Sequence, residues 1–207
     1  MKVLILNGSP KVNGNDATLL NEMIRVFNEL GVETELVQVG KENIRGCIAC
    51  GYCAKKQGCV FNDLVNETAK KLDASDGLVI ASPTYFASPN GTLISFLDRL
   101  FHSRYYDLRY KVGAAFAIAR RAGTSTNFDV LNKYFTISGM PVVSGDYWNN
   151  GFGGGEGAVK EDAEGMRNAR VVARRMVFLM EAIALEKKAN PSLLEEEAKV
   201  WTNFIEK

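Results

Sequence analysis

The sequence predicts an α/β fold: a doubly wound, five-stranded parallel sheet in the order 2-1-3-4-5, with helices on both faces and extra C-terminal helices. Two observations support this prediction. Short, continuous apolar runs, such as residues 3–6, are typical of strands buried on both faces. Longer amphipathic segments separate these runs, and such alternation is typical of a parallel sheet covered by helices. Ligands of this fold bind outside the carboxyl ends of the strands, at the switch between strands one and three.

The apolar runs and the amphipathic segments give the expected order of elements. The expected strands cover residues 3–6, 34–39, 77–81, 112–119 and 141–143. The expected helices between them cover residues 19–27, 64–72, 93–101 and 128–137. Gly31 follows the first of these helices and ends it.

Two further helices are expected after Glu161. The first has acidic residues at its start and arginines farther along, which suits the helix dipole. The second begins at Asn190, which precedes a proline at the first helical position. Its apolar stripe consists of Leu194, Ala198, Trp201 and Ile205. We interpret residues 1–207 as one domain, with a cysteine-rich insertion at 46–60 and a helical extension at 159–207.

Length and composition exclude several classes of protein. A chain of 207 residues can bury a substantial core, and 46% hydrophobic with 24% charged residues is ordinary for a globular protein. The net charge of +1 lacks the basic bias of nucleic-acid binders. No apolar run approaches the ~20 residues that span a bilayer, and the apolar start is too short for a signal peptide. We therefore expect a cytoplasmic protein that binds neither nucleic acid nor membrane.

The loop after the first strand, residues 7–18, opens directly into a helix. Backbone amides at a helix N-terminus lack partners and carry partial positive charge, so they suit a phosphate. Gly8 and Gly14 allow the backbone to approach a ligand closely. The loop contains neither the dinucleotide-binding G-x-G-x-x-G pattern nor a P-loop. Alone, it predicts an anion site, and the alternative is a turn with a helix cap.

Two more loops follow strands at the same edge of the sheet. The loop after the third strand contains Tyr85 and Phe86, which can support a flat ring, and Thr84, which can donate to its polar edge. The alternative is that the aromatic pair packs in the core. The loop after the fourth strand contains Arg120 and Arg121, which can stabilise negative charge on a ring, bind a nucleotide phosphate, or form a solvated basic turn. The convergence of three loops is a stronger indication of a ligand than any single loop.

These motifs resemble those of the NAD(P)H-dependent FMN reductase and iron–sulfur flavoprotein families, within the flavodoxin-like superfamily. The first loop is similar to their pattern Gly-Ser-Pro-Arg, a spacer, then Gly-Asn-Thr/Ser, with Lys11 in place of the arginine and Asp16 in place of the hydroxyl. Residues 82–99 resemble their second signature, and the resemblance extends over nearly the whole chain. It implies a flavodoxin-like fold that binds FMN. Because a carboxylate facing a phosphate is unfavourable, we expect Asp16 to turn away and Thr18 to supply the hydroxyl.

The FMN contacts that the resemblance implies lie on the three loops. They are Ser9, Lys11, Asn15, Thr18, Pro83, Thr84, Tyr85, Phe86, Ser88, Arg120, Arg121, Gly123 and Thr124. For Asp98 and Arg99 we favour helix capping or an interface salt bridge, and for His102 a structural role. No catalytic acid or base is expected, because the flavin carries the chemistry.

The four cysteines, Cys47, Cys50, Cys53 and Cys59, lie close together in the sequence. Such clustering in a cytoplasmic chain indicates a metal or redox site rather than a disulfide framework. The spacing C-x2-C-x2-C-x5-C suits a [4Fe–4S] cluster and matches the compact motif of iron–sulfur flavoproteins. Zinc usually prefers two separated C-x2-C pairs. Packing or redox thiols without a cluster are the alternative, because flavin reductases with similar cysteines occur.

The sequence therefore favours an FMN-dependent oxidoreductase. It would take a hydride from NADH or NADPH and pass electrons to a small-molecule or redox-protein acceptor, through a [4Fe–4S] cluster if one is bound. One alternative is a non-enzymatic electron carrier, and another is a zinc-binding module with an empty flavin site. The resemblance also implies a homodimer or homotetramer. We expect the glycine-rich, aromatic stretch 146–155 to cover the flavin, of this or a neighbouring subunit, and the alternative is a surface loop.

Overall fold

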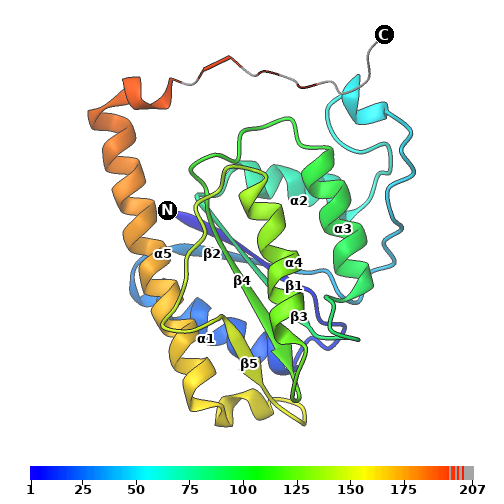
Figure 1. The fold of residues 1–207 in the computed structure, drawn as a ribbon, viewed down its shortest axis with the longest axis vertical. Helices are drawn as coiled ribbons and strands as arrows, with labels where there is room; N and C mark the ends of the chain where they lie inside the picture. Colours follow the sequence, from blue (N-terminus) through cyan, green and yellow to red (C-terminus); the bar gives the residue numbers. More distant parts are fainter. Residues whose placement is uncertain (196, 199, 201, 203–207) are drawn as a thin grey trace.

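The computed structural model describes residues 1–195, 197, 198, 200 and 202 and is drawn in Figure 1. Five parallel strands form one sheet in the order β2-β1-β3-β4-β5, which confirms the predicted fold class and strand order. The strands are β1 (Lys2–Asn7), β2 (Glu33–Gln38), β3 (Gly77–Pro83), β4 (Val112–Ala119) and β5 (Asn150–Phe152). The α-helices are α1 (Asn15–Glu29), α2 (Leu64–Asp73), α3 (Gly91–His102), α4 (Thr124–Thr136) and α5 (Ala163–Ala189). Short 3-10 helices form at η1 (Tyr52–Ala54), η2 (Ala158–Glu161) and η3 (Pro191–Leu194).

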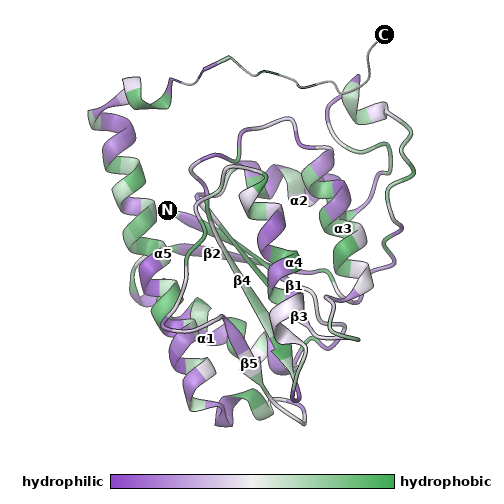
Figure 2. Cartoon of the chain, viewed as in Figure 1, coloured by the Kyte–Doolittle hydropathy of each residue, from purple (hydrophilic) through white to green (hydrophobic). Residues whose placement is uncertain are grey.

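The helices cover the sheet on both faces, because alternate residues of each strand point to opposite sides. Val3 and Ile5 of β1 pack in the core beneath α1 and α5. Leu4 and Leu6 pack in a second core, beneath α2, α3 and α4. All eight residues of β4 are buried, and this strand is mainly green in the hydropathy colouring of Figure 2. No helix among the described residues is long and apolar enough to cross a membrane.

The fifth strand differs from the prediction. Residues 141–143 make a single bridge to β4, and the regular strand β5 forms farther along the chain. Between the two pairings β4 advances from Gly113 to Ala117, whereas its partner advances twice as far, from Val142 to Asn150. The additional residues therefore leave the sheet as a loop. The prediction was wrong because pairing with β4 is a long-range interaction, which a local apolar run does not report.

The C-terminal region also differs from the prediction. Helix α5 confirms the first of the two expected helices and begins at an Asp162 cap, whose side chain accepts from the Gly165 amide. The second expected helix ends after one turn of 3-10 helix, and the described residues beyond Leu194 form no helix. Trp201 and Ile205 of the predicted stripe lie outside the described residues. Proline removes a backbone donor and restricts the residue before it, which favours the break at Asn190.

The loop after β1 packs directly against Gly40, which lies two residues after the end of β2. The Gly40 amide donates to the Asn7 carbonyl at 3.1 Å. A Cβ atom on Gly40 would lie 2.2 Å from the Gly8 carbonyl oxygen and 2.3 Å from the Ser9 carbonyl carbon. Both contacts are with backbone, which cannot rotate away. Gly40 is therefore the residue that allows the two segments to approach.

We expect Gly40→Ala to lower the free energy of unfolding by about 1–3 kcal/mol, because the added methyl group must displace the loop after β1. Gly91→Ala is the matched control, since a Cβ atom there meets nothing within 4 Å. The control should be neutral or slightly stabilising, because Gly91 is helical. Urea unfolding of the three proteins measures the difference, and equal stability of the two variants would contradict the packing argument.

Candidate functional site

The loops after β1, β3 and β4 lie side by side at the carboxyl edge of the sheet (Figure 1). The Asn90 side-chain amide, from the loop after β3, donates to the Gly8 carbonyl at 2.9 Å. A Cβ atom on Gly123, in the loop after β4, would lie 3.0 Å from the Cα atom of Ala87. At the switch point of the sheet, the loop after β3 therefore contacts both of the other loops that the sequence singles out.

The loop after β1 presents an uncapped helix N-terminus. The Ser9 hydroxyl is buried and accepts from the Lys11 amide at 3.2 Å, while the Lys11 side chain is exposed. Gly14 is the N-cap residue of α1 and has no side-chain bond to the first turn. The first amides of an α-helix have no partner within the helix. This end of α1 therefore offers backbone donors and a positive partial charge to an anion.

Asn15 and Thr18 bond to protein backbone. The Asn15 amide group donates to the Gly153 carbonyl at 3.0 Å, and its oxygen accepts from the Val159 amide at 3.0 Å. The Thr18 hydroxyl donates to the Gly14 carbonyl at 3.1 Å. Asn15 thus fixes the chain after β5 beside the loop after β1, a role that no local pattern indicates. The contacts of Asn15 and Thr18 with a phosphate stay predictions.

Asp16, in the first turn of α1, is buried with only 2% of its surface exposed. Its Oδ1 atom has no hydrogen-bond partner, and burial raises the pKa of the carboxyl to about 7, although its own backbone amide opposes the rise. Burial of the Tyr85 phenol and the negative charge of Asp16 both raise the pKa of Tyr85. The Asp16 carboxyl is therefore close enough to the loop after β3 to affect its charge. We expect the Asp16 side chain to turn away from a phosphate. The structure shows that it does not turn into solvent.

The loop after β3 makes a two-residue turn with an unusual backbone. The Tyr85 and Ser88 amides each donate to the other's carbonyl at 2.9 Å. The central residues, Phe86 and Ala87, have φ of 51° and 61°, and a left-handed conformation costs an L-residue roughly 1–2 kcal/mol. Such strain gathers at functional sites. Tyr85 is half exposed and Phe86 fully exposed, so neither packs in the core.

The remaining predicted contacts flank this turn and begin α4. Pro83 ends β3, and the Thr84 hydroxyl accepts from the Asn127 amide group at 2.9 Å. Arg120 and Arg121 are exposed at the end of β4. Gly123 has φ of 85° and is the N-cap residue of α4, and Thr124 is the buried first residue of that helix.

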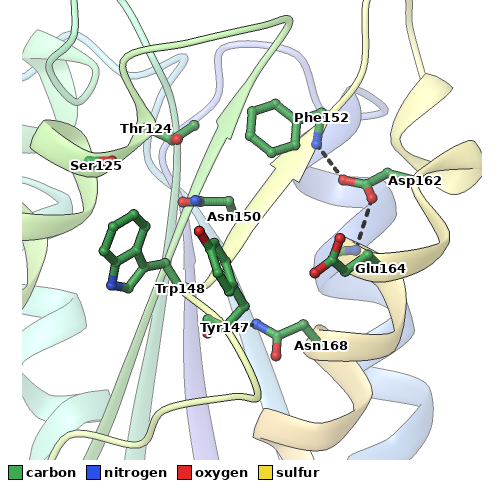
Figure 3. Close-up of a pocket in the computed structure, with 10 residues that line it drawn as sticks. Thr124, Ser125, Tyr147, Trp148, Asn150, Phe152, Asp162, Glu164 and Asn168 are labelled. Atoms are coloured by element: carbon green, nitrogen blue, oxygen red, sulfur yellow. Dashed lines mark hydrogen bonds between the residues drawn. The ribbon is translucent and has the colours of Figure 1, made fainter.

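A cavity of about 400 Å³ opens beside the start of α4 (Figure 3). Its aromatic walls are Tyr147, Trp148 and Phe152, all from the chain around β5. Asn150 also lines it, and the Asn150 Oδ1 atom is buried without a hydrogen-bond partner. The aromatic part of the stretch 146–155 thus lines a cavity that Thr124 also borders, and its covering role stays a prediction.

The four cysteines are free and line one small cavity, which lies between residues 47–53, residues 59–61 and the end of α3. The cysteines are Cys47, Cys50, Cys53 and Cys59. Within the described part of the chain, no group of three His, Cys, Asp or Glu side chains is arranged to hold a metal ion. The four thiols of the predicted cluster site therefore lie around one cavity, but they are not arranged to ligate a metal.

Arg99 contacts the cysteine site, and sequence reasoning missed this role. Its guanidinium is buried, bonds both carboxylate oxygens of Asp63 at 2.8 and 2.9 Å, and donates to the Cys59 sulfur at 3.3 Å. It also lies over the Phe61 ring at 4.8 Å. An arginine on the apolar face of a helix was the available signal. Asp98, by contrast, accepts a hydrogen bond from the Tyr134 hydroxyl at 2.6 Å.

Comparison with solved structures supports the fold. RosB, in a crystal structure with the intermediate 8-demethyl-8-formylriboflavin-5'-phosphate, matches with a TM-score of 0.66 and 18% identity, covering 100% of this chain and 91% of that chain. The apo NADH:FMN oxidoreductase EmoB matches with a TM-score of 0.57 and 20% identity, covering 92% of each chain. A flavodoxin from the domain Archaea matches with a TM-score of 0.56 and 15% identity, covering 85% of this chain and 99% of that chain. These likenesses show the flavodoxin-like fold.

Sequence comparison shows the family. An iron–sulfur flavoprotein of Methanocaldococcus jannaschii is 32% identical over 191 residues, covering 88% of this chain and 99% of the relative. An iron–sulfur flavoprotein of Methanosarcina thermophila is 31% identical over 188 residues, covering 88% of this chain and 97% of the relative. The family model for NADPH-dependent FMN reductase matches residues 1–155. The chain therefore belongs to the NADPH-dependent FMN reductase family of flavodoxin-like oxidoreductases.

Proposed function

We propose that the protein takes a hydride from NADH or NADPH at a bound FMN and passes the electrons to a separate acceptor. The observation that supports this proposal most is that the loop after β3 joins the loops after β1 and β4 at the switch point of the sheet, beside the uncapped start of α1. Doubly wound sheets bind their ligands at this place. The family match points to the same cofactor.

The residues of the three loops suit the parts of FMN. The backbone amides at the start of α1 would hold the phosphate, with the Ser9 hydroxyl fixing the turn that presents them. The strained turn would place Tyr85 at the ring, and Thr84 beside its polar edge. Exposed Arg120 would bring positive charge to the same edge. Bound FMN supplies hydride acceptance and one-electron transfer, which no side chain provides.

We expect the protein to bind one FMN per chain and to lose its visible flavin absorption when NADH or NADPH is added without oxygen. Ser9→Ala should weaken FMN binding about tenfold, because a hydrogen bond of roughly 1–1.5 kcal/mol that fixes the loop is lost. Ser144→Ala is the matched control, because Ser144 is exposed and only its carbonyl makes a hydrogen bond that the structure records.

Fluorescence titration measures the affinity, and stopped-flow absorption measures the reduction. Flavin that binds but stays oxidised with both nucleotides would support a pure electron carrier instead. A protein that takes up no FMN would contradict the proposal as a whole.

A [4Fe–4S] cluster at the cysteines is a second proposed cofactor, and it would carry electrons between the flavin and the acceptor. The observation in its favour is that four free thiols line one cavity. The described conformation does not ligate a metal, so binding would require the segment around η1 to close on the cluster. The buried guanidinium of Arg99, at the Cys59 sulfur, would then stabilise the added negative charge of a reduced cluster.

We expect anaerobic reconstitution to give about four iron and four sulfide per chain. Cys50→Ala should lose most of both, because a thiolate ligand is missing. Ser103→Ala, in the same cavity but without a thiol, is the control and should keep the full content. Less than one cluster's worth of iron in the unmodified protein would contradict this proposal, and bound zinc in a colourless protein would replace it.

A further inference from the structure

We propose that Asp16 carries a proton in the FMN complex and donates a hydrogen bond to the flavin phosphate, so that FMN binding takes up a proton and weakens at alkaline pH. This inference rests on the proposed FMN function and deepens it. It concerns one side chain of this protein, at the position where the loop after β1 enters α1.

The position of Asp16 points to a ligand. The side chain is at the second residue of α1, two residues after the uncapped Gly14. Only 2% of Asp16 is exposed, yet its Oδ1 atom has no hydrogen-bond partner. Buried polar atoms in proteins nearly always have a partner. An anion bound at this helix N-terminus would place an oxygen acceptor next to the unpartnered carboxyl, and a protonated carboxyl can donate to it.

The surroundings of Asp16 favour the protonated form. Within the described residues no cation forms an ion pair with Asp16. With one exception, the charged side chains on the loops after β1 and β4 and around η2 are exposed: Lys11, Arg120, Arg121, Glu156, Lys160 and Glu161. The exception is Asp162, which is half-buried and accepts hydrogen bonds from the Phe152 and Gly165 amides. The remaining titratable neighbour is the Tyr85 phenol, which is neutral below its raised pKa. A carboxylate at this position would therefore meet the phosphate charge with no ion-pair partner of its own.

The phosphate should strengthen this preference. In the free protein burial raises the pKa of Asp16 to about 7 against the opposing effect of its own backbone amide, so the carboxyl is partly ionised at neutral pH. A bound phosphate brings negative charge close to it, and a like charge raises the pKa of an acid further. Above about pH 7, each FMN that binds therefore brings one proton from solvent onto Asp16. The binding constant should then fall about tenfold for each pH unit.

The test is the dissociation constant of FMN between about pH 6 and about pH 9, measured by fluorescence quenching on the apoprotein. The unmodified protein should bind about tenfold more weakly for each unit above about pH 7. Asp16→Asn and Asp16→Thr should bind with little pH dependence, because an amide or a hydroxyl donates without ionising. The phosphate's own ionisation, with a pKa near 6, affects all proteins equally and cancels in the comparison.

Two further measurements sharpen the test. Glu161→Gln removes an exposed carboxylate of η2 and should keep the unmodified pH profile. Calorimetry in buffers of different ionisation enthalpy should show about one proton taken up per FMN at about pH 8 in the unmodified protein, and much less in Asp16→Asn. Identical pH profiles for the unmodified protein and both Asp16 variants would overturn this inference and leave the proposed function standing. Absence of FMN binding in all the proteins at every pH would overturn the proposed function instead.

Discussion

The backbone contact that fixes the loop after β1 determines the rest of the site. On one side the Gly8 amide donates to the Ala81 carbonyl of β3 at 2.8 Å. On the other side Gly40 follows β2 so closely that a side chain has no room. The loop is thus confined by the main chain of both neighbours, independently of what its own side chains contact. The start of α1 and the loops after β3 and β4 take their places around this fixed segment.

Much of the fold follows from local pattern, and the exceptions have physical reasons. The β4 bounds agree with the apolar run that predicts them, because a strand buried on both faces has a continuous apolar sequence. The fifth strand does not, because Asn150-Gly151-Phe152 contains only one large apolar residue. Its place beside β4 depends on long-range pairing. Helix α5 agrees with its charge pattern as well as its apolar face.

The candidate site shows the same division. Topology alone places the three loops together, because parallel strands end at one edge. The bonds of Asn15 to Gly153 and Val159 could not be predicted, since these residues are far apart in the sequence. Arg99 could have been found, because a charge on a helix face occupied by Phe96 and Leu100 requires a partner. The sequence shows that Asp16 departs from the family pattern, but only the structure shows that its side chain is buried.

The interruption of the fifth strand separates the pairing of the sheet from the loop that lines the cavity beside α4. The pairing at Val142 and the pairing at Asn150 each have their own register with β4, and the chain between them belongs to neither. Neither register depends on the length of this intervening chain, in which Asn149 is held by the Asn168 side chain. Tyr147 and Trp148 lie in the same chain and line the cavity beside α4. Evolution can therefore reshape that cavity in length as well as in composition, while the scaffold that holds the neighbouring loops stays unchanged.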